Sequence, residues 1–318
     1  MNKIFALLCI SLTTFGQISA PQKEWRQLFN GKNLDGWDIK IRGYDLNENF
    51  GKTFSVKDKK IVVNYDAYDP FNFRYGHLFF KETFSHYKIA VEYRFIGDQA
   101  KGGEGWATRN SGIMVHGQPA QTMLKGQDFP ISIEVQLLGG LSNGKSRTSC
   151  NLCTPGTHVV YENKLDTRHC INSTSKTFDG DQWVRAEVEV LGDSIIRHFV
   201  NNELVITYQK PVIGGGVVSG FDPLIKIDGK RLTEGSISLQ SESHPIEFRK
   251  VEILNLKGCM DPKAKNFKSY YIEKDNSKCK YYISLSLFIF VKIKLANQHE
   301  ERYFYFFISR KFFRFFSN

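Results

Sequence analysis

A short strand-like segment carries the residues best suited to acid–base chemistry. Apolar and polar side chains alternate in it, with Ile131, Ile133, Val135 and Leu137 on one side and Ser132, Glu134 and Gln136 on the other. Because successive side chains of a strand point to opposite faces, Glu134 and Gln136 face away from the core. The same alternation over residues 113–116 sends Met114 and His116 to that face. A carboxylate and an imidazole in one basin could supply a general base and a donor, proton shuttle or metal ligand.

Other polar and aromatic residues could join this basin. Glu242 and His244 follow the strand that ends at Gln240, and they are expected at its rim. Trp106 lies in a glycine-rich loop, where an aromatic face suits the apolar side of a sugar ring or simply plugs the loop. The candidate ligand contacts are Gln136, Trp106, Arg109, Met114, Gln240 and Glu242, and His158 and His169 are candidate contributors from a long loop over residues 139–176. The ordinary alternative is that these histidines lie on the loop surface.

Several common catalytic arrangements are absent from the sequence. It has no recognisable Ser-His-Asp set, phosphate-binding glycine loop or nucleotide signature. A conventional glycosidase needs two opposed carboxylates, and the sequence offers Glu134 without a convincing second one.

The elements that would hold these residues are strands. Residues 184–190 alternate apolar and polar side chains, as a half-buried antiparallel strand does, and Asn201-Asn202-Glu203 indicates a hairpin turn. Further strands are expected over residues 88–95, 113–116, 131–137, 237–240 and 251–256. No segment has a sustained helical period. Residues 25–256 therefore suit one all-β sandwich domain.

The N-terminus has the pattern of an export signal. Lys3 precedes an apolar run over residues 4–12, which is too short to span a bilayer, and small polar residues follow up to Ala20. We predict that residues 1–20 are a signal peptide and that the protein is secreted or periplasmic, with no integral membrane span.

Export would allow disulfide bonds to form. We predict that Cys153 pairs with Cys170 and that Cys259 pairs with Cys279, which leaves Cys150 without an assigned partner. Cys150 and Cys153 also have the spacing of a redox or zinc motif, but no second such pair is present to complete a zinc site.

The positive charge lies at the C-terminal end. The net charge is +10, and residues 257–318 carry +8 of it. The main domain is therefore nearly neutral, and nucleic acid is not an expected partner. Residues 257–281 resemble small cysteine-bracketed repeats that begin Gly-Cys-x-Asp-Pro, which would form a disulfide-closed knob. Residues 282–318 are basic and aromatic, and we expect them to lie outside the fold.

A series of motifs, in order, resembles the 3-keto-disaccharide hydrolase family, also called DUF1080. The matching segments are residues 28–37 (LFNGKNLDGW), 87–95 (YKIAVEYRF), 110–113 (NSGI), 133–138 (IEVQLL), 180–183 (GDQW), 200–203 (VNNE), 235–240 (GSISLQ) and 246–249 (IEFR). The resemblance implies a concanavalin A-like jelly-roll sandwich of two antiparallel sheets with a sugar in its concave face. It also implies action on glycosides already oxidised to a ketone at C3.

That substrate would define the roles of the candidate residues. A ketone at C3 acidifies the C2 hydrogen, so Glu134 would act as the general base and His116 as a polarising donor, proton shuttle or metal ligand. A hydrogen-bond donor or a divalent metal ion would stabilise the enolate oxygen, and the sequence does not decide between them. The anomeric group would leave by elimination, and added water would complete the hydrolysis.

The chain departs from the family pattern at two places near this site. Val115-His116-Gly117 stands where many members have an arginine, and Gly139-Gly140 replaces a usual aspartate. A non-catalytic carbohydrate-binding, lectin-like module is therefore the alternative function, and a surface adhesion protein that uses the tail is a third. A buried glutamate with a shifted pKa would favour the enzyme.

Overall fold

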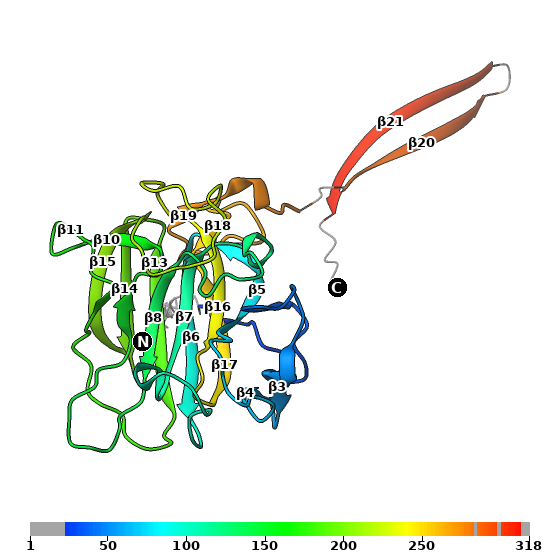
Figure 1. Cartoon of the computed structure of the whole chain (residues 1–318). Coiled ribbons are helices and arrows are strands. Elements are labelled where there is room, and N and C mark those ends of the chain that lie inside the picture. The colour runs from blue at the N-terminus through cyan, green and yellow to red at the C-terminus, as the bar shows by residue number, and fades with distance from the viewer. Residues whose placement is uncertain (1–22, 283–284, 298–299, 313–318) are drawn as a thin grey trace, which may run out of the picture.

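The architecture is a sandwich of two antiparallel β-sheets, with a small unit and a hairpin after it (Figure 1). The computed structural model describes residues 23–282, 285–297 and 300–312. These residues contain no α-helix, and none of them form a helix that could cross a membrane. The short 3-10 helices are η1 (Phe50–Lys52), η2 (Gly105–Ala107), η3 (Ala120–Thr122) and η4 (Asn276–Lys278). The predicted signal peptide, residues 1–20, lies outside the described residues.

One sheet has ten strands and packs against a second sheet of seven strands. Its order is β11 (Lys164–Asp166), β10 (Thr157–Tyr161), β15 (Glu203–Ile213), β14 (Ile195–Val200), β13 (Val184–Leu191), β6 (His86–Phe95), β17 (Ile246–Asn255), β4 (Lys60–Val63) and β3 (Phe54–Lys57), with β1 (Arg26–Gln27) beside β17. The predicted alternation in β13 is confirmed, since its even-numbered residues are buried and its odd-numbered residues are partly exposed. The predicted hairpin is also confirmed: Asn201 and Asn202 both have positive φ between β14 and β15.

The other sheet has seven strands, and its outer face carries the candidate functional site. Its order is β12 (Cys170–Ile171), β9 (Asn151–Cys153), β8 (Ile133–Leu138), β7 (Asn110–Gly117), β16 (Gly235–Ser241), β5 (Gly76–Phe84) and β2 (Trp37–Ile41). Strand β8 begins two residues later than predicted, but its alternation is as expected. Ile133, Val135 and Leu137 are fully buried in the core between the sheets. Two facing antiparallel sheets of this kind make a jelly-roll sandwich.

A separate small unit follows the sandwich. The predicted disulfide between Cys259 and Cys279 is present, and β18 (Lys257–Gly258) pairs with β19 (Glu273–Lys274). The amides of Ile272 and Glu273 donate hydrogen bonds to the carbonyl of Leu256, at 2.9 and 3.2 Å, and tie the unit to the end of the last sandwich strand.

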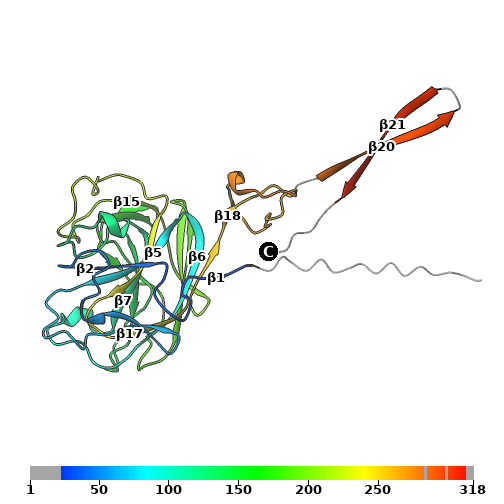
Figure 2. The same ribbon diagram turned by 90° about the vertical axis from the view of Figure 1, so that its right-hand side faces the viewer.

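The C-terminal residues form a long hairpin. Strands β20 (Leu285–Asn297) and β21 (Glu300–Phe312) pair with each other along their whole lengths, and in the described chain they pair with no other strand. The hairpin extends away from the sandwich in both views (Figures 1 and 2).

We predict that removing residues 282–318 leaves the sandwich folded. Neither large sheet uses a strand from this segment, so the melting temperature should stay within about 2 °C of the full-length value, as for changes outside packed features. Thermal unfolding of the two proteins, monitored by circular dichroism, measures this. A drop of 8 °C or more, on the scale of about 2–4 kcal/mol for a domain of this size, would show that the hairpin packs on the sandwich.

Candidate functional site

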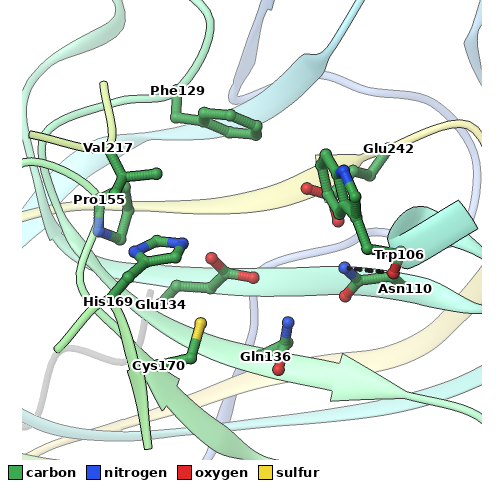
Figure 3. Close-up of a pocket in the computed structure, with 10 residues that line it drawn as sticks. All are labelled: Trp106, Asn110, Phe129, Glu134, Gln136, Pro155, His169, Cys170, Val217 and Glu242. Carbon is green, nitrogen blue, oxygen red and sulfur yellow. Dashed lines mark hydrogen bonds between the residues drawn. The ribbon is translucent and has the colours of Figure 1, made fainter. Parts of the chain in front are cut away.

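A pocket of about 460 Å³ opens on the outer face of the seven-stranded sheet (Figure 3). Strands β7 and β8 form its floor, and loops form its walls. The lining residues are Trp106, Asn110, Phe129, Glu134, Gln136, Pro155, His169, Cys170, Val217 and Glu242. The polar side chains of this set come mainly from the sheet, whereas the apolar side chains come from loops.

The direction of Glu134 depends on a glycine in the next strand. Glu134 faces Met114 across β7 and β8, and Gly112 faces Gln136. A Cβ atom placed on Gly112 would lie 2.8 Å from Oε1 and 2.9 Å from Cγ of Glu134. The carboxyl group therefore lies over the bare backbone of Gly112, and any larger residue there would displace it.

Glu242, directly after β16, is the second carboxyl of the pocket. Burial raises the pKa of Glu134 to about 8. Burial also raises the pKa of Glu242 well above its ordinary value, and the nearby charges of Glu134 and Glu104 raise it further. Neither Glu134 nor Glu242 takes part in an ion pair within residues 23–282, and Oε2 of Glu242 has no hydrogen-bond partner there. Ionisation of Glu134 therefore opposes ionisation of Glu242.

An aromatic wall stands beside the two acids. Tyr75 is the middle ring, with its centroid 4.7 Å from that of Phe129 and 6.2 Å from that of Trp106. Trp106 is 54% exposed, so much of its surface remains free for a ligand. Burial raises the pKa of the Tyr75 phenol, and the neighbouring carboxylate of Glu104 raises it further.

The loop that carries Trp106 is held by several hydrogen bonds. Gln99 donates to the carbonyl of Glu104 at 2.7 Å and to Oγ of Ser243 at 2.8 Å. Thr108 donates to the side-chain oxygen of Gln99 at 2.6 Å. Arg147 donates to the carbonyl of Arg109 at 3.3 Å and to that of Trp106 at 3.5 Å, at the end of the loop before β7. The position of the Trp106 indole is thus fixed by contacts with distant parts of the chain as well as by its own loop.

The opposite wall is closed by the predicted disulfide between Cys153 and Cys170, which is present. Cys153 faces Glu134 in the neighbouring strand and Cys170 faces Cys153, so the bond covers the edge beside the acid. His169 lies next to it, and its ligand nitrogen and the two sulfurs lie within 4.8 Å of one another. Both sulfurs are bonded in the disulfide, so this cluster lacks the thiolates that a metal site would need.

Five of the predicted site residues line the pocket, namely Glu134, Gln136, Trp106, Glu242 and His169. The others lie elsewhere. Met114 and Gln240 are fully buried in the sheet, and both side-chain polar atoms of Gln240 have no partner. Arg109 pairs with Asp181 on the surface, and His158 lies on β10 of the ten-stranded sheet.

The placement of His116 departs from the prediction. Ser236 pairs with Gly117 and Ser238 with Met114, so β7 has one extra residue opposite β16. This bulge gives His116 a φ of 52° and turns its ring toward the other sheet. There its Nε2–H donates to the carbonyl of Gly192 at 2.9 Å. His116 therefore does not share the groove with Glu134, because the simple alternation ends before the bulge.

Sequence reasoning missed part of the lining. Asn110 lies on the same face as Gly112 and Met114, so extending the alternation by two residues would have found it. Phe129, Pro155 and Val217 come from loops and have no periodic pattern that could identify them. The second carboxylate was considered only as a rim residue, because nothing in the sequence places Glu242 opposite Glu134.

Comparisons with known proteins identify a family. The sequence profile described as the 3-keto-alpha-glucoside-1,2-lyase-like domain matches residues 24–254. No curated protein matches the chain.

Several solved structures are similar to the sandwich. One is a protein assigned as a glycosyl hydrolase from Parabacteroides distasonis, at 17% identity, covering 73% of this chain and 100% of that one with a TM-score of 0.43. A carbohydrate-binding module from Bacillus subtilis has 10% identity, coverage of 69% and 96%, and a TM-score of 0.39. A β-glucanase from Bacillus licheniformis has 11% identity, coverage of 74% and 98%, and a TM-score of 0.40.

The buried acid should make stability depend on pH. The pKa of Glu134 is about 8 in the folded protein, whereas that of an ordinary glutamate is 4.5, so the folded protein holds this proton to a higher pH. Between these values the folded state binds more protons than the unfolded state, so stability falls as pH rises. A Glu134→Gln variant has no ionisable group at this position, so it does not undergo this loss of stability. Its advantage in melting temperature over the wild type should grow from pH 4.5 to pH 8.

Glu189 provides a control, because its pKa is shifted in the opposite direction. Burial raises its pKa, but hydrogen bonds from Arg197 and Lys88 outweigh that effect and lower it. Glu189→Gln should therefore cost stability above the unfolded pKa and cost less as the pH falls through the folded value. A pH-independent difference between Glu134→Gln and the wild type would contradict the raised pKa of Glu134.

The disulfide at the pocket should stabilise the sandwich. Replacing Cys153 and Cys170 together by serine opens a bridge with a sequence separation of 17. The expected loss is about 3 kcal/mol, measured by urea unfolding. Replacing Cys259 and Cys279 in the same way should change the unfolding of the sandwich by less than about 0.5 kcal/mol, since that bridge closes the small unit. Equal losses from the two pairs would show that the bridges stabilise one cooperative unit.

Proposed function

Because the chain belongs to the 3-keto-alpha-glucoside-1,2-lyase-like family, we propose that it hydrolyses glycosides whose C3 hydroxyl has been oxidised to a ketone. The reaction removes the C2 proton, eliminates the anomeric substituent and adds water. The observation that carries the proposal is the pair of buried, unpaired carboxyls, Glu134 and Glu242, in one pocket.

Glu134 acts as the base. A catalytic base is most effective when its pKa lies near the working pH, and burial brings the pKa of Glu134 to about 8. The C2–H bond breaks, its proton passes to Glu134, and the electron pair is delocalised onto the C3 oxygen as an enolate. Gly112 keeps the carboxyl over the floor of the pocket, where the sugar ring lies.

Glu242 acts as the acid. Burial and the neighbouring carboxylates raise the pKa of Glu242 well above its ordinary value, so Glu242 keeps its proton when Glu134 has lost one. When the enolate collapses back to the ketone, the C1–O bond breaks and the leaving oxygen takes a proton from Glu242. Water then adds across the new C1–C2 double bond. In this scheme Glu242 takes the donor role that the sequence suggested for His116.

The remaining polar side chains hold the sugar. Gln136 and Asn110 line the floor, where their amides can bind hydroxyl groups, and Trp106 offers a ring face. Oε1 of Gln136 accepts a hydrogen bond from Nδ2 of Asn151 at 3.0 Å, which leaves Nε2 of Gln136 as the free donor. This contact orients the amide so that its donor side remains available.

A sugar-binding module without catalysis would need no such acids. Burying two carboxyls without a cation costs free energy, and binding neutral hydroxyl groups does not require it. Perturbed acids in a pocket are typical of catalytic sites. This favours an enzyme over a lectin.

Export is part of the proposal. The pair of disulfide bonds is typical of proteins from oxidising compartments. Together with the signal-like sequence of residues 1–20, this supports a secreted or periplasmic carbohydrate-active hydrolase.

The decisive experiment compares a 3-keto-glycoside with the matching ordinary glycoside. The wild type should release sugar from the keto form alone, with kcat/KM rising as the pH approaches about 8, because Glu134 must be ionised. Glu134→Gln should lower kcat at least about 100-fold, the usual scale for a general base. Binding of the intact glycoside should change little.

His116→Gln provides the matched control, since His116 lies outside the pocket. Its kcat should stay within about threefold of the wild type once folding is confirmed. Near-normal turnover by folded Glu134→Gln would refute the assignment of the base. Binding of both glycosides without turnover of either would favour the lectin-like function.

A further inference from the structure

The pocket has two chemically different ends. Its floor carries amides and carboxyls, namely Asn110, Gln136, Glu134 and Glu242. In Figure 3 the ring of His169 lies just below Pro155, and the side of the pocket away from Trp106 is otherwise formed by Phe129, Pro155 and Val217. Their side chains have no hydrogen-bonding atom. This apolar end, defined by Phe129, Pro155 and Val217, plays no part in the chemistry described above.

The apolar end is built into the fold. Val218 is buried in a small hydrophobic cluster with Ile131, Ile213 and Leu232, and Phe129 packs against the same cluster. Val217, the neighbouring residue, is 44% exposed and lines the pocket. The packing of Val218 therefore fixes the backbone at Val217, whose side chain lines the pocket.

Hydrogen bonds join the two loops that carry Phe129 and Val217. Ser219 donates from its amide and its hydroxyl to the carboxylate of Asp128, at 2.8 and 2.6 Å. Gln127 donates to the carbonyl of Phe129 at 2.8 Å. The apolar end is therefore already formed before a ligand binds, which lowers the cost of binding there.

A second sugar would bind poorly at this end. Apart from the ring of His169 beside them, its hydroxyl groups would find no polar partner at Phe129, Pro155 and Val217, and unpaired buried hydroxyls are costly. A compact apolar ring would instead gain from the same burial. The volume of about 460 Å³ lies in the lower part of the usual range for ligand pockets, roughly 300–1,000 Å³, and suits one sugar with one further ring.

We propose that the apolar end selects the aglycone: the enzyme prefers glycosides with a compact aromatic or alicyclic aglycone over disaccharides. This inference rests on the proposed function for the reaction, but it concerns a different part of the pocket. Glu134 and Glu242 serve the sugar, whereas Phe129, Pro155 and Val217 serve the leaving group.

The test compares phenyl 3-keto-glucoside with a 3-keto-disaccharide of the same anomeric configuration, and both anomers are used. The wild type should favour the phenyl compound at least about tenfold in kcat/KM, equivalent to ~1.4 kcal/mol. Val217→Asn should bring the ratio down at least about fivefold. Leu224→Asn is the matched control, because Leu224 belongs to the same loop between β15 and β16, is 81% exposed and does not line the pocket. Its ratio should equal that of the wild type.

Equilibrium binding separates this inference from the proposed reaction. Phenyl glucoside and maltose, both unoxidised, are titrated calorimetrically into Glu134→Gln with and without Val217→Asn. Tighter binding of phenyl glucoside that depends on Val217, without turnover of any keto compound, would support the apolar end and refute the reaction. Turnover of both keto compounds with no preference, or a preference unchanged in folded Val217→Asn, would refute the apolar end alone. Neither binding nor turnover would refute both.

Discussion

Burial of the alternate residues of β8 is the constraint on which the site depends. Ile133, Val135 and Leu137 are fully buried between the two sheets, and their packing holds the strand in one register. A shift by one residue would move all three into the groove and send Glu134 into the core, at a large cost in free energy. The direction of the acid is therefore a consequence of the hydrophobic core, and Gly112 in β7 refines it.

Carboxyl groups on the two sheets have pKa values shifted in opposite directions. On the outer face of the ten-stranded sheet, burial raises the pKa of Glu92, but hydrogen bonds from Lys250 and Arg249 outweigh it and lower the pKa. In the groove, Glu134 and Glu242 have no cation within the described part of the chain to pair with, and burial raises both pKa values. The same residue type is thus paired with cations on one face and left buried without them on the other. That contrast is the physical basis of the proposal that the acids in the groove are catalytic.

The loops complete what the sheet begins. The sheet supplies the polar floor, whereas hydrogen-bonded loops bring in Trp106 on one side and Phe129, Pro155 and Val217 on the other. The disulfide between Cys153 and Cys170 closes the edge next to Glu134. The proposed reaction at the anomeric carbon would need both parts, since the sugar would meet the acids while its leaving group occupied the remaining space. The division of labour between a rigid sheet and variable loops is common in binding sites.

The sequence by itself determined the strands, the hairpin at Asn201-Asn202 and the outward direction of Glu134 and Gln136. These features follow from short-range patterns, because side-chain alternation and turn preferences act over a few residues. The tertiary structure alone decided that Glu242 lies beside Glu134, since β16 joins β7 only through long-range pairing. It also decided that His116 turns away, because a bulge depends on the register of the partner strand. Phe129 and Val217 reach the pocket through contacts between distant loops, and such contacts have no period in the sequence.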